Sequence, residues 1–555
     1  MIEKKESSKD NKLVEIFPAG KRPYLWIFFI GFVLYARNLF FGFTYFDDNV
    51  LILENLFFLK DLSNFFKSFT MEVFHVLHSS AAYYRPMLTI SYMLDAQVSG
   101  ESAFFYHFSS VVIHTINSCL VYVLLSRFNF KKVTAFVFSL VFTVHPVLIQ
   151  AVSWIPGRND SLLALFLLPS VIFFMDFLEK GKARDLYLHF LFIALAFFTK
   201  ESALLIPILL VIYSLFIAKK SRFGKSIPII LVGWFFIFLG WFFLRSIALE
   251  GNPLRYTFPD AVLVIIQNSP AILLYLGKVF LPFNLSVLPI LPDSTLVYGT
   301  ISLIFICFCL IFSKNKNWWL VIFGGVWFLA FLVPAFIRPD TTYVADFLEH
   351  RVYVPIIGLF ILLGEVDFVK NMQISKLFTK ALLVCIFAVL VVTNVIHNNN
   401  FKDRLTFWKN AVENSPSHPL AHKNLGAMYY LDDNLDAAME EFIKTELIYP
   451  TEAMIHNNLG LIYYRKGDYK KAEEEYFKEL ALYPNYDNAY MNLGLLYYKQ
   501  NNKDKAAQMW LKTVSVNPDH KEALRALTIY YSQDKKDSQK ANFYYREALK
   551  RGVEF

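Results

Sequence analysis

Long apolar runs alternate with short polar stretches over the first two thirds of the chain and then stop. The first apolar run begins at Tyr24 and the last ends near His397. From Asn398 onward the sequence is polar and helix-like. The pattern predicts an all-α protein, with a polytopic helical membrane domain over residues 24–397 followed by a helical domain over residues 398–555.

About eleven crossings are expected in the membrane domain. The apolar runs that predict them lie near residues 24–43, 105–126, 133–150, 161–178, 186–199, 202–218, 226–249, 297–312, 318–337, 351–366 and 380–397. The stretch 44–104 is too polar to be a span and is expected to form a long external loop. The run 262–283 is ambiguous; we expect it to dip into the membrane or lie flat, because a crossing there would put two basic loops outside. Such a crossing would also reverse the side of the C-terminal domain.

Basic residues give the expected orientation. Residues 1–23, the predicted cytoplasmic tail, contain Lys4, Lys5, Lys9, Lys12, Lys21 and Arg22. Because basic residues stay on the cytoplasmic side, the loop after the first span is expected on the external or luminal face, as is the C-terminal domain. The protein is thus expected in the inner or plasma membrane of a bacterium, or in the endoplasmic reticulum of a eukaryote.

Composition supports the membrane assignment. Hydrophobic residues make up 56% of the chain, which is more than an ordinary soluble protein contains. The segment from Asn398 holds 22 basic and 22 acidic residues, so the net charge of +8 belongs to the membrane domain. That charge does not indicate a nucleic-acid partner.

The C-terminal domain contains a 34-residue repeat. Leu-Gly pairs recur at that step, and so do single tyrosine, alanine, aromatic and proline positions. The first of these recurring positions are Leu425, Gly426, Tyr429, Ala438, Phe442 and Pro450. The pattern resembles the tetratricopeptide repeat, in which small residues let two antiparallel helices pack closely. It predicts an α-solenoid built from a half repeat at 401–416, repeats at about 421–454, 455–488 and 489–522, and a degenerate repeat at 523–555.

Asn424, Asn458 and Asn492 occupy one register in the three full repeats. A row of carboxamides can hydrogen-bond an extended peptide of any sequence, because each amide is both donor and acceptor. The repeats of the soluble O-linked N-acetylglucosamine transferases are similar in this respect. Helix-capping or water-facing asparagine is the alternative interpretation.

Asp47 and Asp48 lie just past the first predicted span. Two adjacent carboxylates at a membrane surface are costly unless they bind a cation, take a proton or find basic partners. The alternative is a solvated start of a loop. Further polar groups interrupt the apolar half and also map mostly to the external side. They are Tyr84-Arg85-Pro86, His107, His145-Pro146, Gly157-Arg158-Asn159-Asp160, Lys200-Glu201 and Glu349-His350-Arg351.

The order of these motifs resembles one family, the transmembrane and tetratricopeptide repeat-containing O-mannosyltransferases and their bacterial relatives. That family belongs to the multi-spanning GT-C class, which uses polyprenyl-phosphate-linked sugars. The resemblance extends from about Tyr24 to the end of the repeats. Asn159 stands where the family pattern has alanine, and His350 interrupts a Glu-Arg pair.

The resemblance implies transfer of mannose or another hexose from a polyprenyl-phosphate sugar to Ser or Thr hydroxyls of exported proteins bound by the repeats. Asp47 and Asp48 are the candidate catalytic residues, either as general base or as ligands of a divalent cation. The candidate ligands of the donor phosphate are Arg85, Arg158, Lys200 and Arg351. The candidate supporting residues are Tyr84, His107, His145, Asp160, Glu201 and Glu349.

Two other functions remain open at the sequence level. A non-catalytic membrane scaffold would use the repeats to gather envelope proteins, and its polar groups would be dispersed. A transporter or lipid flippase would need charged or helix-breaking residues at mid-membrane depth, whereas most of these groups lie near one end of the spans.

Overall fold

The structure is a computed structural model that describes residues 20–77, 83–218, 223–249, 257–337, 344–374, 376–553 and 555. The described chain is helical and contains no strand; Ile290 and Asp346 form an isolated antiparallel bridge. It divides into two compact units, Met1–Ser415 and Pro416–Phe555. The all-α fold class predicted from the sequence is confirmed. Residues 1–19 of the expected cytoplasmic tail lie outside the described residues.

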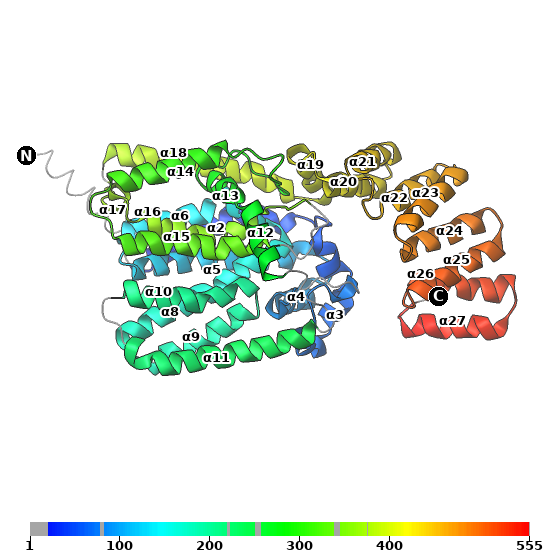
Figure 1. Ribbon diagram of the computed structural model, residues 1–555, viewed down its shortest axis with the longest axis horizontal. Coiled ribbons are helices and arrows are strands. Elements are labelled where there is room, and N and C mark those ends of the chain that lie inside the picture. Colours follow the sequence, from blue (N-terminus) through cyan, green and yellow to red (C-terminus); the bar gives the residue numbers. More distant parts are fainter. Residues whose placement is uncertain are drawn as a thin grey trace, which may run out of the picture. The chain divides into compact units, whose positions relative to one another are not determined.

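The first unit is a bundle of apolar helices, and its long members run side by side in Figure 1. Its helices are α2 (Arg22–Tyr35), α3 (Leu56–Lys60), α4 (Pro86–Ser99), α5 (Ala103–Arg127), α6 (Lys132–Val144), α7 (Gln150–Ser153), α8 (Arg158–Lys180), α9 (Ala183–Phe197), α10 (Ile206–Phe216), α11 (Phe223–Ala248), α12 (Phe258–Asn268), α13 (Ala271–Phe280), α14 (Val297–Phe312), α15 (Trp318–Leu332), α16 (Pro355–Leu363), α17 (Asp367–Lys370), α18 (Leu377–Asn398) and α19 (Arg404–Asn414). Three short turns of 3₁₀ helix also bear on the site. They are η1 (Ala36–Phe40), η8 (Glu201–Leu205) and η10 (Glu349–Val352).

Fewer helices than expected are long enough to cross a membrane. Among the described residues there are six: Arg22–Phe40, Ala103–Arg127, Ile155–Lys180, Phe223–Ala248, Trp318–Phe336 and Leu377–Phe401. The number rises to eight if two bent pairs, α6 with Pro146–Ser153 and α12 with α13, are one span each. The eleven crossings predicted from the sequence are not confirmed, because several apolar runs fold into helices too short for a hydrocarbon core of about 30 Å.

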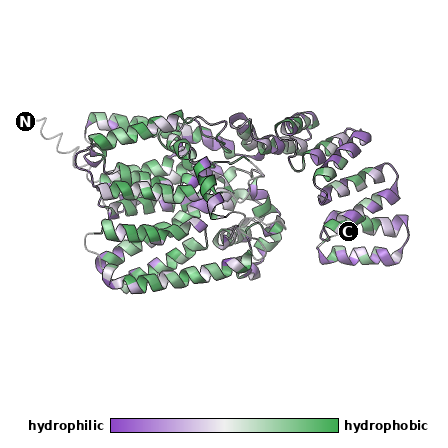
Figure 2. Ribbon diagram, in the orientation of Figure 1, coloured by the Kyte–Doolittle hydropathy of each residue, from purple (hydrophilic) through white to green (hydrophobic). Residues whose placement is uncertain are grey.

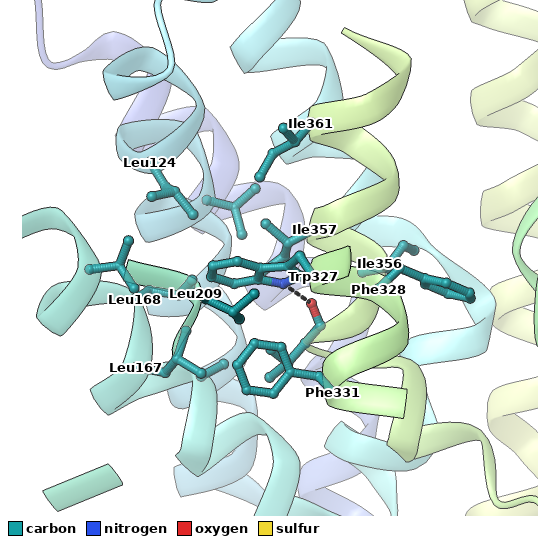
Figure 3. Close-up of a cluster of buried hydrophobic side chains, with 14 of the residues drawn as sticks. Leu124, Leu167, Leu168, Leu209, Trp327, Phe328, Phe331, Ile356, Ile357 and Ile361 are labelled. Atoms are coloured by element: carbon teal, nitrogen blue, oxygen red, sulfur yellow. Dashed lines mark hydrogen bonds between the residues drawn. The ribbon is translucent and has the colours of Figure 1, made fainter. Parts of the chain in front are cut away.

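Trp327 of α15 lies in the main apolar core of this unit (Figure 3). Its indole N–H donates to the carbonyl oxygen of Val354 at 3.0 Å. The other side chains labelled around it come from α5, α8, α10, α15 and α16: Leu124, Leu167, Leu168, Leu209, Phe328, Phe331, Ile356, Ile357 and Ile361. The hydrogen bond satisfies the one polar group of the side chain inside an apolar medium, where an unpaired donor is costly.

Close backbone contact joins α15 to α16. A Cβ atom added at Gly324 would lie 2.4 Å from the carbonyl oxygen of Gly358, and one added at Gly358 would lie 2.4 Å from that of Gly324. Small residues are common where membrane helices approach each other closely. Because α16 begins three residues after η10 ends, this contact also helps to fix the position of η10.

The second unit consists of helix pairs and is more polar than the first (Figure 2). Its helices are α20 (Pro419–Leu431), α21 (Leu435–Ile448), α22 (Ile455–Arg465), α23 (Tyr469–Leu482), α24 (Asp487–Lys499), α25 (Lys503–Val516), α26 (Lys521–Ile529) and α27 (Ser538–Lys550). In each of the first three pairs, a glycine of the first helix faces an aromatic ring of the second. The closest approach of an added Cβ atom would be 2.7 Å between Gly426 and Phe442, 2.6 Å between Gly460 and Tyr476, and 2.2 Å between Gly494 and Trp510.

Helix α19 lies in the first unit, although the sequence groups it with the repeats as a half repeat at 401–416. Its Trp408 is fully buried, and the indole N–H donates to the carbonyl oxygen of Thr44 at 3.0 Å. The hydroxyl of Ser415 donates to the carbonyl oxygen of Leu288 at 2.6 Å. The units therefore divide after Ser415 rather than at residue 398, because the side chains of this segment pack on the membrane unit.

Gly494→Ala is expected to destabilise the third repeat by about 1–2 kcal/mol. Overpacking a core costs about 1–3 kcal/mol, and the better helix propensity of alanine offsets up to about 1 kcal/mol. Adding Trp510→Phe, which removes the indole nitrogen nearest to the new methyl group, is expected to restore part of the loss. Hydrogen exchange of the α24 amides in the solubilised protein measures both changes. Wild-type exchange in Gly494→Ala would contradict the expected clash.

Candidate active site

Three cationic side chains converge where helical segments begin. Arg85 immediately precedes α4, Lys200 immediately precedes η8, and Arg351 lies in η10. Their positive charges all act on His350, where they lower the pKa of the imidazole in addition to the larger effect of burial. The structure thus brings together three of the four cations predicted to bind a phosphate. We call Arg85, Lys200 and Arg351 the cation cluster.

Two members of the cation cluster are held tightly by carboxylates. The Nζ atom of Lys200 lies 2.8 and 2.7 Å from the two carboxylate oxygens of Asp160, in the first turn of α8. Arg351 donates to the carboxylate of Asp346 at 2.7 Å and to its carbonyl oxygen at 2.6 Å. Burial lowers the pKa of Lys200, and the attraction of Asp160 offsets only part of that effect. Both cations are therefore fixed in position by the protein itself.

Arg85 is held more loosely. Its Nε atom is 3.7 Å from the Glu201 carboxylate, and its guanidinium carbon lies 4.5 Å from the centre of the Tyr83 ring. This buried Nε has no hydrogen-bond acceptor among the described residues. Glu201 in turn accepts from the backbone N–H of Tyr84 at 3.2 Å. Arg85 is consequently held less tightly by its carboxylate than Lys200 and Arg351 are.

His350 places a neutral imidazole among the cations. Its backbone N–H and its Nδ1 both lie 3.1 Å from the side-chain oxygen of Gln150. The amide nitrogen of Gln150 donates to the carbonyl oxygen of Val287 at 2.8 Å, which fixes the orientation of the amide. Nδ1 must therefore carry the proton, and Nε2 presents a lone pair 3.6 Å from the Asp160 carboxylate.

Glu349 fixes the first residue of η10 from inside the protein. Its carboxylate accepts from Lys278 Nζ at 2.6 Å, from the Ser286 backbone N–H at 2.8 Å and from His397 Nε2 at 2.9 Å. The side chains of Glu349 and Lys278 are fully buried. Glu349 is thus a structural partner of α13 and α18 that orients the two residues after it, His350 and Arg351.

The two predicted catalytic carboxylates have different surroundings. Asp48 is buried, and its oxygens accept from the backbone N–H of Thr44 at 2.6 Å, the Thr44 hydroxyl at 3.0 Å and the backbone N–H of Phe46 at 2.9 Å. Burial raises the pKa of Asp48 in spite of these hydrogen bonds. Asp47 is half-buried, and Tyr45 before it has a φ of 55°, which is uncommon outside glycine. We call residues 44–48 the carboxylate loop.

Aromatic rings join the carboxylate loop to the cation cluster. The Phe46 ring stacks on Trp154 with centroids 5.4 Å apart, and Trp154 lies 5.4 Å from the imidazole of His350. The carboxylate loop and η10 therefore border the same indole ring, although they are some 300 residues apart in the sequence.

Arg158 does not join the other three cations. It is fully buried, and its guanidinium donates to the carboxylate of Asp95, the carbonyl oxygen of Tyr106 and the hydroxyl of Ser110. These bonds tie α8 to α4 and α5. Because all three guanidinium nitrogens are engaged inside the protein, the predicted contact of Arg158 with a phosphate has no support in this structure.

Three predicted supporting residues bond to the backbone. His107 contacts the carbonyl oxygen of Gly42 at 3.4 Å, and His145 contacts that of Val279 at 2.8 Å. The hydroxyl of Tyr84 donates to the carbonyl oxygen of Phe69 at 2.8 Å. Asp160 and Glu201 are instead the carboxylate partners of Lys200 and Arg85 in the cation cluster. The structure therefore divides the supporting residues into a group beside the cations and a group that holds loops in place.

Asn424, Asn458 and Asn492 are half-buried at one position of α20, α22 and α24. The amide nitrogen of Asn492 donates to the side-chain oxygen of Asn457 at 2.8 Å. One member of the row is therefore bound within the repeats themselves.

Four residues that shape the site are not among those predicted from the sequence: Asp346, Gln150, Lys278 and His397. Lys278 carried a usable signal, because a lone lysine in an apolar run requires a partner. That run is 262–283, which is expected from the sequence to dip into the membrane or lie flat. Nothing in the sequence pairs Asp346 with Arg351 or Gln150 with His350.

The described residues contain no group of three or more His, Cys, Asp or Glu side chains that could hold a metal ion. Asp48 already accepts hydrogen bonds from Thr44 and Phe46 on both of its oxygens. The two adjacent aspartates therefore do not fit a dedicated site for a divalent cation.

Comparison with known proteins adds two family matches. The family model described as dolichyl-phosphate-mannose-protein mannosyltransferase matches residues 86–242, which include Asp160, Lys200 and Glu201. The tetratricopeptide repeat model matches residues 453–486. Among solved structures, the crystal structure of MamA matches this chain at 24% identity and a TM-score of 0.24. The match covers 27% of this chain and 86% of the MamA chain.

Three curated relatives carry one activity in their names. Protein O-mannosyl-transferase TMTC1 from Mus musculus is 31% identical over 105 residues, which is 19% of this chain and 11% of that protein. Protein O-mannosyl-transferase F38B6.6 from Caenorhabditis elegans is 32% identical over 144 residues, which is 25% of this chain and 20% of that protein. Protein O-mannosyl-transferase TMTC3 from Mus musculus is 28% identical over 211 residues, which is 35% of this chain and 21% of that protein.

The matched segments span only about a tenth to a fifth of the length of these relatives. Within that extent the comparisons agree with the sequence motifs and with the repeats. They confirm that this membrane protein is similar to the transmembrane and tetratricopeptide repeat-containing protein O-mannosyltransferases.

Proposed function

We propose that this protein is a membrane glycosyltransferase. It moves a sugar, mannose or another hexose, from a polyprenyl-phosphate donor to Ser or Thr hydroxyls of exported proteins. The observation that carries the proposal is the convergence of Arg85, Lys200 and Arg351 around a neutral His350, across one indole ring from the carboxylate loop. Similarity to named O-mannosyltransferases supports the same reaction.

The cation cluster binds the phosphate of the donor. Arg85, whose Nε has no acceptor among the described residues, is the more loosely held cation, while Lys200 and Arg351 are held in place by Asp160 and Asp346. Cations fixed before the reaction stabilise the charge that develops on a leaving phosphate without reorganising. The paired carboxylates keep the site near neutrality when no donor is bound.

An apolar cavity whose lining includes residues on both sides of Lys200 in the sequence receives the first part of the polyprenyl chain. The cavity of about 280 Å³ is lined by residues of α9, η8, α10 and α11, namely Phe197, Leu204, Pro207, Leu231, Trp234, Phe235 and Phe238. Phe197 and Leu204 flank Lys200 in the sequence, so the apolar lining and a phosphate-binding cation lie on one short segment. This arrangement suits a lipid with an anionic head and a long hydrocarbon chain.

Asp47 is the better candidate for the general base. The hydroxyl of the acceptor attacks the anomeric carbon and loses its proton to Asp47, while the bond from that carbon to the phosphate breaks. The phosphate leaves with the negative charge, which the cation cluster stabilises. Asp48 instead uses its oxygens to hold Thr44 and Phe46, and so shapes the loop that carries Asp47.

The repeats bind the acceptor protein. Asn424, Asn458 and Asn492 hold its backbone, so that many Ser and Thr sites can be presented without a sequence requirement. In this proposal the active site and the repeats lie on the external or luminal face, where exported proteins are found.

Asp47→Asn is expected to lower kcat for sugar transfer by about 10²–10⁴-fold, the usual contribution of a general base, with the KM for the donor unchanged. Asp48→Asn is expected to lower the melting temperature as well, because an amide has one acceptor oxygen and cannot accept from the N–H groups of both Thr44 and Phe46 on two separate oxygens. Transfer from radiolabelled polyprenyl-phosphate sugars to an exported-protein extract measures the rates. Full activity of Asp47→Asn would rule out Asp47 as the base.

Arg85→Met is expected to reduce kcat/KM for the donor about 10–100-fold, because a hydrogen bond to a charged group contributes about 1.5–3 kcal/mol. Arg525→Met, at an exposed position of α26, is the matched control and should leave the value unchanged. The kinetics are measured with the donor varied at saturating acceptor. Equal donor kinetics in the two variants would place the phosphate elsewhere.

Replacing Asn424, Asn458 and Asn492 together by alanine is expected to raise KM at least tenfold for protein acceptors. The same variant should keep wild-type kinetics with a small alcohol acceptor, which does not need the repeats. Parallel assays with the two acceptors make the comparison. An equal loss with both would mean that the asparagines act on the active site rather than on the acceptor.

A further inference from the structure

The segment Asn398–Ser415, between α18 and the repeats, contacts the chain around the carboxylate loop at five places. Two of the contacts are hydrogen bonds between side chains, from Arg37 to Asn399 and from Asn398 to Asn38 (2.7 Å). Two more end on backbone carbonyl oxygens: the Gly42 N–H donates to Lys402 at 2.9 Å, and Trp408 Nε1 donates to Thr44 at 3.0 Å. In the fifth, the Arg404 guanidinium lies 5.2 Å from the centre of the Tyr45 ring. The two stretches therefore pair from η1 to the start of the carboxylate loop.

Trp408 makes the most direct of these contacts with the carboxylate loop. It is fully buried, and its ring lies 5.2 Å from the ring of Phe46 in an edge-to-face arrangement. Its indole N–H bonds to the carbonyl oxygen of Thr44, the residue whose N–H and hydroxyl hold Asp48. A single side chain of α19 therefore contacts Thr44 and Phe46, the two residues whose backbone N–H groups bond to the Asp48 carboxylate.

The same segment also contacts the loop that supports η10. The side-chain oxygen of Asn410 accepts from the backbone N–H of Val287 at 3.2 Å, and Ser415 bonds to the carbonyl oxygen of Leu288. The neighbouring Ser286 N–H donates to Glu349, one residue before His350. The carboxylate loop and the supports of the cation cluster thus share one neighbour.

We propose that Asn398–Ser415 is a positioning segment of the active site, and that Trp408 is the residue that places the carboxylate loop. The segment acts through Thr44 and Phe46 rather than by contact with a substrate. It sets the distance from Asp47 to the cation cluster. That distance matters because Asp47 removes the proton and the cations stabilise the phosphate in the same step. The catalytic consequence rests on the proposed transferase function, whereas the placement of the loop does not.

Trp408→Phe tests the proposal because it keeps one aromatic ring and removes the donor to Thr44 together with the smaller ring of the indole. The expected result is a fall in kcat of at least tenfold with both KM values unchanged, because misplacing a reacting group affects the chemical step. Faster hydrogen exchange of the amides of residues 44–48 is expected alongside it. Trp318→Phe, an exposed tryptophan in α15, is the matched control and should change neither quantity.

A second variant covers the case in which Trp408→Phe folds poorly. Asn399→Ala removes the bond to Arg37 at an exposed position and is expected to lower kcat about twofold to fivefold, about 0.4–1 kcal/mol, with faster exchange of the same amides. Wild-type kcat in both variants would overturn the proposed effect on catalysis. If the wild-type protein transfers no sugar at all, the proposed function fails. Hydrogen exchange of residues 44–48 then tests the placement of the carboxylate loop by itself. Wild-type exchange of these amides in both variants would overturn that placement.

Discussion

The buried ion pair between Lys278 and Glu349 is the interaction on which the rest of the site depends. Neither charge can be left alone in a medium of low dielectric constant, so each constrains the segment that carries the other. His397 adds the last long helix to the same carboxylate. Since His350 and Arg351 come directly after Glu349, a contact deep in the apolar unit determines where a neutral imidazole and a cation are presented.

The same rule accounts for the composition of the cation cluster. Each cation has a carboxylate of its own, and the partners come from segments far apart in the chain: α8 for Lys200, η8 for Arg85 and the residues before η10 for Arg351. Such pairing makes the positive charges tolerable in apolar surroundings and fixes their positions. Arg158 shows the other outcome, because a cation whose partners satisfy it completely becomes part of the framework.

Aromatic and small residues perform the packing in both units. A ring against a glycine joins the two helices of each full repeat, and glycine against glycine joins α15 to α16. Around the carboxylate loop, Phe46 packs against Trp154, Phe407 and Trp408. These contacts bring together residues from the start, the middle and the end of the membrane unit. They also explain why α19, which is polar enough to resemble a repeat helix, lies with the membrane unit.

The sequence by itself determined the helical class, the apolar character of the first unit and the 34-residue register of the second, because these depend on local periodicity. It also named Arg85, Lys200 and Arg351 as candidate site residues, since charged residues in apolar surroundings stand out. Only the tertiary structure decided which charges meet: it separated Arg158 from the other cations, distinguished Asp48 from Asp47, and added Asp346, Gln150, Lys278 and Trp408. It also decided how many apolar runs form helices long enough to span a membrane. The physical reason is that hydrogen bonds and ion pairs between distant segments depend on distances that no local pattern encodes.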